Sequence, residues 1–280
     1  MSTVKVVTDS SVQLTPEEIE KYQITVVPLT IEIDGQSYID DKDITREEFM
    51  KRMAQADNLP TTSQPSVGTF IDTFDRLAVD GSPILAIHMT ETISGTVNAA
   101  RQAAQISRAD VTVIDSQYTD RAMAFQVLEA AQMAESGASV QEIIPAIEQI
   151  KTKTELIMGV RDLTNLVKGG RISRVSGMIS GLLNIKIVLT LKDGQLEVVS
   201  KGRGMKTIMK YIDKVIAKLK QVPHIKGIGI SHAAGLDVAQ EIEAKIKAEL
   251  PQVHILIRST DPVIATHAGP GAFALMYYTD

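Results

Sequence analysis

The feature that most constrains the fold of this chain is a regular alternation of two hydrophobic patterns through residues 1–153. Short β-branched runs, such as residues 4–8 and 84–89, are each followed by a stretch with helical periodicity and a cap residue at its start. Such alternation predicts βαβ units, which place the strands in a parallel sheet and pack helices against it. Further strands are expected at residues 24–33 and 111–115, a loop at 58–65, and helices at 45–56, 66–78, 95–107, 119–136 and 139–152.

The pattern changes after residue 153. The turn sequence Lys192-Asp193-Gly194 lies between two apolar runs, residues 185–191 and 196–200, which is typical of an antiparallel hairpin. We therefore expect an α/β fold: an N-terminal α/β domain (1–153) with a mainly parallel sheet flanked by helices, and a smaller C-terminal α+β domain (154–280). Other strands of the second domain are expected at residues 155–160, 225–231, 253–258 and 272–278, and its helices at 205–220 and 237–249.

Composition excludes several functional classes. The 280 residues carry a formal net charge of −5, whereas proteins that bind nucleic acid are usually basic. The absence of cysteine excludes disulfides and thiolate metal sites, and His224, His232 and His254 lack the spacing of metal ligands. The N-terminus has no signal-peptide pattern and no clean apolar stretch reaches about 20 residues, so we expect a cytoplasmic protein without bound metal.

Two hydroxyl-rich turns, each placed at the start of an expected helix, are the strongest candidates for a binding site. One is Thr61-Thr62-Ser63-Gln64-Pro65-Ser66, and the other is Thr90-Glu91-Thr92-Ile93-Ser94-Gly95-Thr96. A helix start presents free backbone N–H groups and the positive end of the helix dipole, and nearby hydroxyls add further donors. Together the two turns could hold one small anion, such as a carboxylate or a phosphate.

A catalytic interpretation of Ser94 is weaker. Ser94 follows an expected strand, as the nucleophile of a serine hydrolase does, and His232 or His267 could serve as its base. However, Thr92 and Thr96 stand where the G-x-S-x-G pattern of these enzymes has glycine. Capping of the next helix or contact with an anion explains Ser94 more simply.

Asp9 offers a second catalytic alternative. It follows an expected strand, as the nucleophilic aspartate of some phosphatases does, but Ser11 stands where those enzymes have a second carboxylate. An Asx turn or a helix cap explains Asp9 without catalysis. His88 lies inside an expected strand and is interpreted as a core residue.

Two glycine-rich basic turns occur in the second half of the chain. They are Lys168-Gly169-Gly170-Arg171-Ile172-Ser173-Arg174 and Lys201-Gly202-Arg203-Gly204-Met205-Lys206. Neither fits the G-x-x-x-x-G-K-[ST] pattern, and G-x-G-x-x-G is absent, so nucleotide binding by this chain has little support. Arg171 and Arg203 either lie in solvated loops or offer planar guanidinium groups to a phosphate that a partner brings.

Two further segments have open interpretations. Residues 266–271 are expected to form an irregular turn between two apolar strands, and His267 within it is either structural or a phosphate contact or acid–base group. Residues 177–183 are apolar but interrupted by glycine. They form either a core helix or a pliable wall for a long apolar ligand, because Gly and Met allow repacking.

Taken together, these segments resemble the DegV family, the fatty-acid-binding proteins that serve bacterial fatty acid kinase. The resemblance covers essentially the whole chain and depends on five segments in a fixed order. They are Val6-Val7-Thr8-Asp9-Ser10, Thr62-Ser63-Gln64-Pro65, Ile93-Ser94-Gly95-Thr96, Gly169-Gly170-Arg171-Ile172-Ser173 and His267-Ala268-Gly269-Pro270-Gly271.

The resemblance implies a long-chain fatty acid buried in a tunnel between the two domains, with its carboxylate hydrogen-bonded by Thr62 and Ser94. Hydroxyl and helix-start donors would compensate the buried carboxylate without a full positive charge. We therefore expect Arg and Lys to lie outside direct contact with it. Secondary contacts with the anion or the tunnel are expected from Ser63, Gly95, Thr96 and Thr266.

The resemblance also implies that another protein performs the chemistry. A separate ATP-dependent fatty acid kinase would convert the carboxylate to an acyl phosphate for phospholipid synthesis, so this chain would have no catalytic residue and no cofactor. Arg171, Arg203 and His267 match residues that engage the kinase or the phosphate. A brief contact with a membrane surface is compatible with this role. A serine hydrolase that uses Ser94 and a lipid-sensing regulatory protein are the alternatives.

Overall fold

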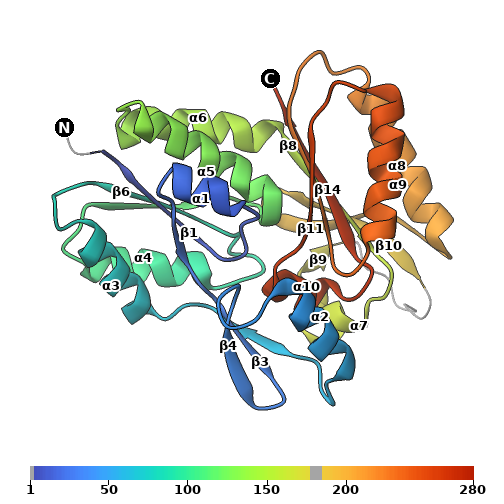
Figure 1. Cartoon of the computed structure of the whole chain (residues 1–280), viewed down its shortest axis with the longest axis horizontal. Helices are drawn as coiled ribbons and strands as arrows, with labels where there is room; N and C mark the ends of the chain where they lie inside the picture. The colour runs from blue at the N-terminus through green and yellow to red at the C-terminus, as the bar shows by residue number, and fades with distance from the viewer. Residues whose placement is uncertain (1–2, 177–184) are drawn as a thin grey trace.

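The N-terminal layer of the molecule is a four-stranded parallel sheet, and the expected α/β fold is confirmed (Figure 1). The computed structural model describes residues 3–176 and 185–280. The strand order is β2-β1-β6-β7. The strands are β1 (Lys5–Asp9), β2 (Thr25–Val27), β6 (Ile84–His88) and β7 (Val111–Asp115).

Helices cover both faces of this sheet because its strands are apolar on both sides. Val7 and Ala86 pack with α3 and α4 on one face, while their neighbours Val6 and Leu85 join the core under α5 and α6 on the other. This alternation follows from the two-residue period of a strand. The four helices are α3 (Val67–Leu77), α4 (Thr96–Ile106), α5 (Asp120–Glu135) and α6 (Val140–Lys153).

A seven-stranded mixed sheet forms the C-terminal layer, in the order β13-β12-β14-β8-β10-β11-β9. The expected hairpin is confirmed: Asp193 and Gly194, with φ of 50° and 76°, connect antiparallel β10 and β11. Helices α8 and α9 cover one face, and α5 and α6 pack against the other (Figure 1). The elements are β8 (Thr154–Val160), β9 (Val175–Ser176), β10 (Lys186–Lys192), β11 (Gln195–Gly202), β12 (Ile225–His232), β13 (Ile255–Ser259), β14 (Phe273–Thr279), α8 (Met205–Leu219) and α9 (Leu236–Glu249).

A third, three-stranded sheet corrects two of the sequence-based expectations. It consists of β3 (Thr30–Ile33) between β4 (Gln36–Ile39) and β5 (Thr61–Ser63). The expected strand over residues 24–33 is wrong as one element, because Pro28 has no N–H for a ladder and separates β2 from β3, which belong to different sheets. The expected loop at 58–65 contains β5, in which Thr62 pairs with Ile31.

Short helices complete the described part of the chain. Helix α10 (Pro262–Ala268) shows that an irregular turn at 266–271 is wrong for its first three residues, which form the last turn of this helix. The local sequence favours a helix start, because the Asp261 carboxylate accepts a hydrogen bond from the Ile264 N–H at 2.9 Å and Pro262 occupies the first helical position. The others are α1 (Pro16–Lys21), α2 (Arg46–Gln55), α7 (Thr164–Lys168) and the 3₁₀ turn η1 (Ile172–Arg174).

The boundary at residue 153 agrees with the change of sheet but does not separate two cores. Described strands of the parallel sheet precede this residue, and those of the mixed sheet follow it. Leu85 of β6 and Leu189 of β10 nevertheless belong to one buried cluster. The division into two domains therefore stays a prediction.

Within the described ranges, no helix has both the length and the apolar character needed to cross a membrane. The glycine-interrupted segment 177–183, interpreted above as a core helix or a pliable wall, lies outside the described residues.

Candidate functional site

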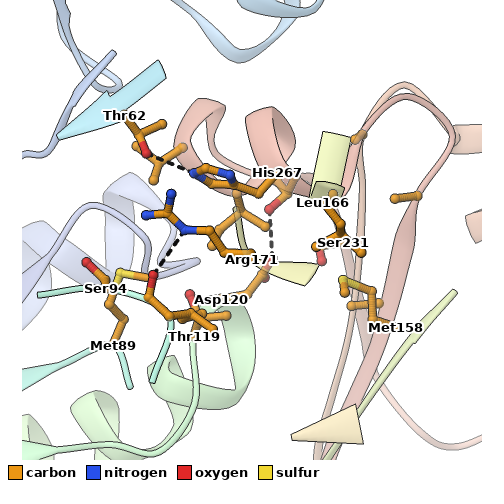
Figure 2. Close-up of a pocket in the computed structure, with 18 of the residues that line it drawn as sticks. Thr62, Met89, Ser94, Thr119, Asp120, Met158, Leu166, Arg171, Ser231 and His267 are labelled. Carbon is orange, nitrogen blue, oxygen red and sulfur yellow. Dashed lines mark hydrogen bonds between the residues drawn. The ribbon is translucent and has the colours of Figure 1, made fainter. Parts of the chain in front are cut away.

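A cavity of about 1270 Å³, counted with the space that opens to solvent, is lined by residues of the mixed sheet, of β5 and of the segments that follow β2 and β6. Both hydroxyl-rich turns contribute to it, through Thr62 and Ser94, and Figure 2 shows Arg171 and His267 beside them. Much of the remaining wall is apolar and includes Leu29, Met89, Leu156, Met158, Leu191, Leu196 and Phe273. The cavity thus combines a polar end with an apolar body.

Ser94 stands at the start of α4 with donors close to it. Its Oγ lies 2.8 Å from Oγ1 of Thr96 and accepts a hydrogen bond from the Thr96 N–H at 3.3 Å. The N-cap residue of α4 is Gly95, which has no side chain, so the N–H groups that follow the Thr96 N–H in the first turn have no side-chain cap. These groups and the positive end of the helix dipole favour an anion at this position.

The side chains of Thr62 and His267 are in contact, although the two residues are 205 positions apart in the sequence. Thr62 Oγ1 and His267 Nε2 lie 2.8 Å apart, because β5 and the last turn of α10 pack together. Burial, with a contribution from the nearby Arg171 charge, lowers the pKa of His267 to about 4. The imidazole is therefore neutral at pH 7 and can either accept a hydrogen bond from Thr62 or donate one to it.

Arg171 brings a cationic side chain into the wall of the cavity, whereas direct contact between a cation and the carboxylate was not expected. Its Nε donates to the Ile93 carbonyl at 3.3 Å and its Nη1 to the Gly169 carbonyl at 2.8 Å, which holds the half-buried guanidinium in the cavity wall near Ser94 (Figure 2). Burial lowers the pKa of Arg171, yet a guanidinium keeps its charge at neutral pH. A full positive charge therefore faces the cavity.

Two glycines allow the polar end to assemble. A Cβ on Gly95 would lie 1.9 Å from the side-chain oxygen of Gln64, so the two hydroxyl-rich turns touch at this point. A Cβ on Gly169 would lie 2.4 Å from Nδ1 of His267, so the imidazole packs directly on this glycine. Neither Gln64 nor Gly169 is singled out by sequence reasoning, although both lie in the quoted segments.

The other predicted contacts divide into two groups. Ser63 and Gly95 line the cavity, whereas Thr96 and Thr266 are not among its lining residues. The Thr266 hydroxyl donates to the Pro262 carbonyl of its own helix at 2.8 Å, and the Thr96 hydroxyl is hydrogen-bonded to the Ser94 hydroxyl at 2.8 Å. Arg203 is exposed between β11 and α8, outside the cavity.

The catalytic alternatives gain no geometric support. Ser94 Oγ makes no hydrogen bond to a histidine among the described residues. Asp9 is buried and accepts from the Ser11 N–H at 3.1 Å, from His88 Nδ1 at 3.0 Å and from the Met89 N–H at 2.9 Å, which confirms the structural interpretation of Asp9 and His88. No group of three metal-binding side chains occurs in the described ranges.

An α/β scaffold around an apolar cavity with a few converging polar groups is typical of proteins that bind small molecules. Comparison with known proteins narrows this class. The family model described as "Uncharacterised protein, DegV family" matches residues 3–280. The chain belongs to the DegV family.

Relatives of known sequence and structure agree with this assignment. A DegV domain-containing protein of Listeria innocua is 48% identical over 100% of both chains, and one of Streptococcus pneumoniae is 46% identical over 99% of this chain and 98% of its own. DegV of Bacillus subtilis, described as a fatty acid binding protein, is 27% identical with a TM-score of 0.92 over 100% of both chains. A DegV family protein of Thermus thermophilus, described for its fatty acid binding, is 30% identical with a TM-score of 0.88 over 99% of this chain and 100% of its own.

Proposed function

We propose that this protein binds a long-chain fatty acid in the cavity, with the carboxylate at Thr62 and Ser94 and the hydrocarbon chain along the apolar wall. The observation that carries the proposal is the joining of a polar end and an apolar body in one cavity. The descriptions of the Bacillus and Thermus relatives as fatty-acid-binding proteins support it.

The energetics of transfer favour such a complex. Burial of an acyl chain of about sixteen carbons contributes about 0.8 kcal/mol per methylene, on the order of 10 kcal/mol before the costs of binding. The carboxylate must exchange water for other partners, and the hydroxyls, the start of α4 and Arg171 supply donors. A carrier of this kind can extract a ligand that otherwise partitions into membranes.

Organic extraction of the purified protein, followed by mass spectrometry, tests the proposal. We expect about one fatty acid per chain, because a cavity with this much apolar surface should retain its ligand through purification. A protein that is empty after purification, and that takes up no fatty acid when one is added, would contradict the proposal.

We also propose that a separate ATP-dependent fatty acid kinase phosphorylates the bound carboxylate, in the cytoplasm, so that the acyl phosphate enters phospholipid synthesis. The family resemblance supports this step, as does the lack of a nucleotide-binding motif in the sequence. The protein would then need no cofactor and no catalytic residue of its own, and brief contact with a membrane would load it.

The two arginines proposed to face the phosphate should differ in their effects. Arg203 is exposed and outside the cavity, so we expect Arg203→Ala to keep fatty acid affinity and to slow phosphorylation by the kinase about tenfold, as for a lost charged contact. Arg171 lines the cavity, so Arg171→Ala should lower both affinity and phosphorylation. The readouts are ligand titration and acyl phosphate formation. Arg76→Ala on the exposed surface of α3 is the matched control, and equal phosphorylation by Arg203→Ala and Arg76→Ala would exclude a role for Arg203.

A further inference from the structure

The cavity wall carries a second group of polar side chains, apart from the proposed carboxylate site. Asp120, Ser231, His232 and Thr260 all line the cavity, with exposed fractions of 2%, 2%, 7% and 6%. Ser231 and His232 end β12, Thr260 follows β13, and Asp120 begins α5. Because β12 and β13 are parallel neighbours, their carboxyl ends meet at one edge of the sheet, where α5 also begins.

Hydrogen bonds join the members of this group to one another. Asp120 accepts from the Thr260 hydroxyl at 2.7 Å, from the Arg121 N–H at 2.7 Å and from the Ser231 hydroxyl. No ion pair joins Asp120 to a described residue, since the nearby Arg46 is bound to Asp41 and to the Ser259 carbonyl. Burial raises the pKa of the Asp120 carboxyl, which indicates that the group lies in a poorly solvated place.

His232 adds an imidazole with an unsatisfied nitrogen to this group. Its Nδ1 is buried and has no hydrogen-bond partner among residues 3–176 and 185–280, although the side chain lines the cavity. A buried polar atom without a partner costs free energy, and native proteins rarely leave one unsatisfied. A plain hydrocarbon chain lying across His232 and Asp120 would exclude water from both and replace none of its hydrogen bonds.

We propose that this second polar group binds a hydroxyl carried on the acyl chain, so that the protein prefers hydroxy fatty acids to plain fatty acids of the same length. The inference depends on the proposed function, because it needs the carboxylate at Thr62 and Ser94 and the chain along the apolar wall. A hydroxyl on the ligand can donate to the His232 imidazole and accept from Ser231, whose hydroxyl then exchanges Asp120 for the ligand. Other residues that line the cavity, such as Leu156, Val263 and Phe273, are apolar and suit the rest of the hydrocarbon chain.

Competitive binding to the delipidated protein tests the preference. The ligands are stearate and a set of monohydroxystearates that differ only in the position of the hydroxyl. We expect at least one isomer to bind about tenfold more tightly than stearate, as for one or two buried hydrogen bonds. Binding of stearate with no isomer preferred would overturn this inference and leave the proposed function intact. Failure of stearate and of every isomer to bind would overturn both.

Variants distinguish the second polar group from the carboxylate site. Ser231→Ala/His232→Phe should retain stearate and lose the preference for the hydroxylated isomer, whereas Ser94→Ala should weaken both ligands and keep their ratio. Ser231→Ala alone provides the same comparison if the double variant fails to fold. A preference that survives in the Ser231 and His232 variants would show that the hydroxyl binds elsewhere and would refute the assignment.

Discussion

Removal of both hydroxyls at the proposed carboxylate site, in Thr62→Ala/Ser94→Ala, should lower the affinity for stearate about a hundredfold or more. A hydrogen bond to a charged group contributes about 1.5–3 kcal/mol, so two of them correspond to at least two powers of ten in the dissociation constant. The loss should exceed that of either single variant, because the two turns approach the same end of the cavity. Titration of delipidated protein with stearate measures it.

A matched control separates this effect from the general loss of hydroxyl groups. Ser136 and Thr152 are exposed, and each hydroxyl donates to a carbonyl of its own helix, to Gln132 and Gln149 respectively. The Ser136→Ala/Thr152→Ala variant should therefore bind stearate as the wild-type protein does. Equal affinity of the two double variants would place the carboxylate elsewhere in the cavity and refute the assignment to Thr62 and Ser94.

The part of the fold that could be predicted is the part encoded by local patterns. The alternation of strand and helix in the first 153 residues predicts the parallel sheet, because each βαβ unit carries its own periodicity and caps. The hairpin at Asp193-Gly194 is equally local, since its residues adopt the positive φ that such turns require. Helix α10 could not be recognised from periodicity, because its seven residues make fewer than two full turns.

The site was predictable only as separate pieces. The hydroxyl-rich turns are contiguous in sequence, so Thr62 and Ser94 can be identified as anion-binding candidates without a structure. The contact of His267 with Thr62 and its packing on Gly169 depend on how β5, α7 and α10 come together, which no local pattern records. Asp120 was missed for the same reason, because its neighbours Ser231 and Thr260 are more than a hundred positions away.

Two buried carboxyls, Asp40 after β4 and Asp261 at the N-cap of α10, should control the response of stability to pH. Asp40 and Asp261 have exposed fractions of 2% and 1%, and each has one carboxyl oxygen without a partner in the described part of the chain. Burial raises the pKa of Asp40 to about 7. Burial and the charge of Asp40 also raise the pKa of Asp261. The folded protein therefore favours the protonated form of this pair.

The sign of the effect follows from proton linkage. A carboxyl whose pKa is higher in the folded state contributes stability that is complete below its unfolded pKa, near 3.8, and is lost as the pH rises toward 7. Asp40→Asn stays neutral at every pH, so this variant should lose less stability between pH 4 and 7. At pH 8 its free energy of unfolding should exceed that of the wild-type protein by a few kcal/mol, on the order expected for a shift of this size.

Urea unfolding at a series of pH values measures the free energy of unfolding of Asp40→Asn and of the wild-type protein. The difference between these two free energies is plotted against pH. His267 acts in the opposite direction, because its lowered pKa makes stability fall as the pH drops from about 6.5 to about 4. Both proteins retain His267, so its contribution cancels in the difference. Asp57→Asn, a substitution at an exposed carboxyl, is the control and should leave the curve unchanged. Parallel curves for Asp40→Asn and the wild-type protein would contradict the prediction, because they would show that Asp40 is ionised in the folded state. The Ser10 hydroxyl and the Arg46 charge would then stabilise the buried carboxylate.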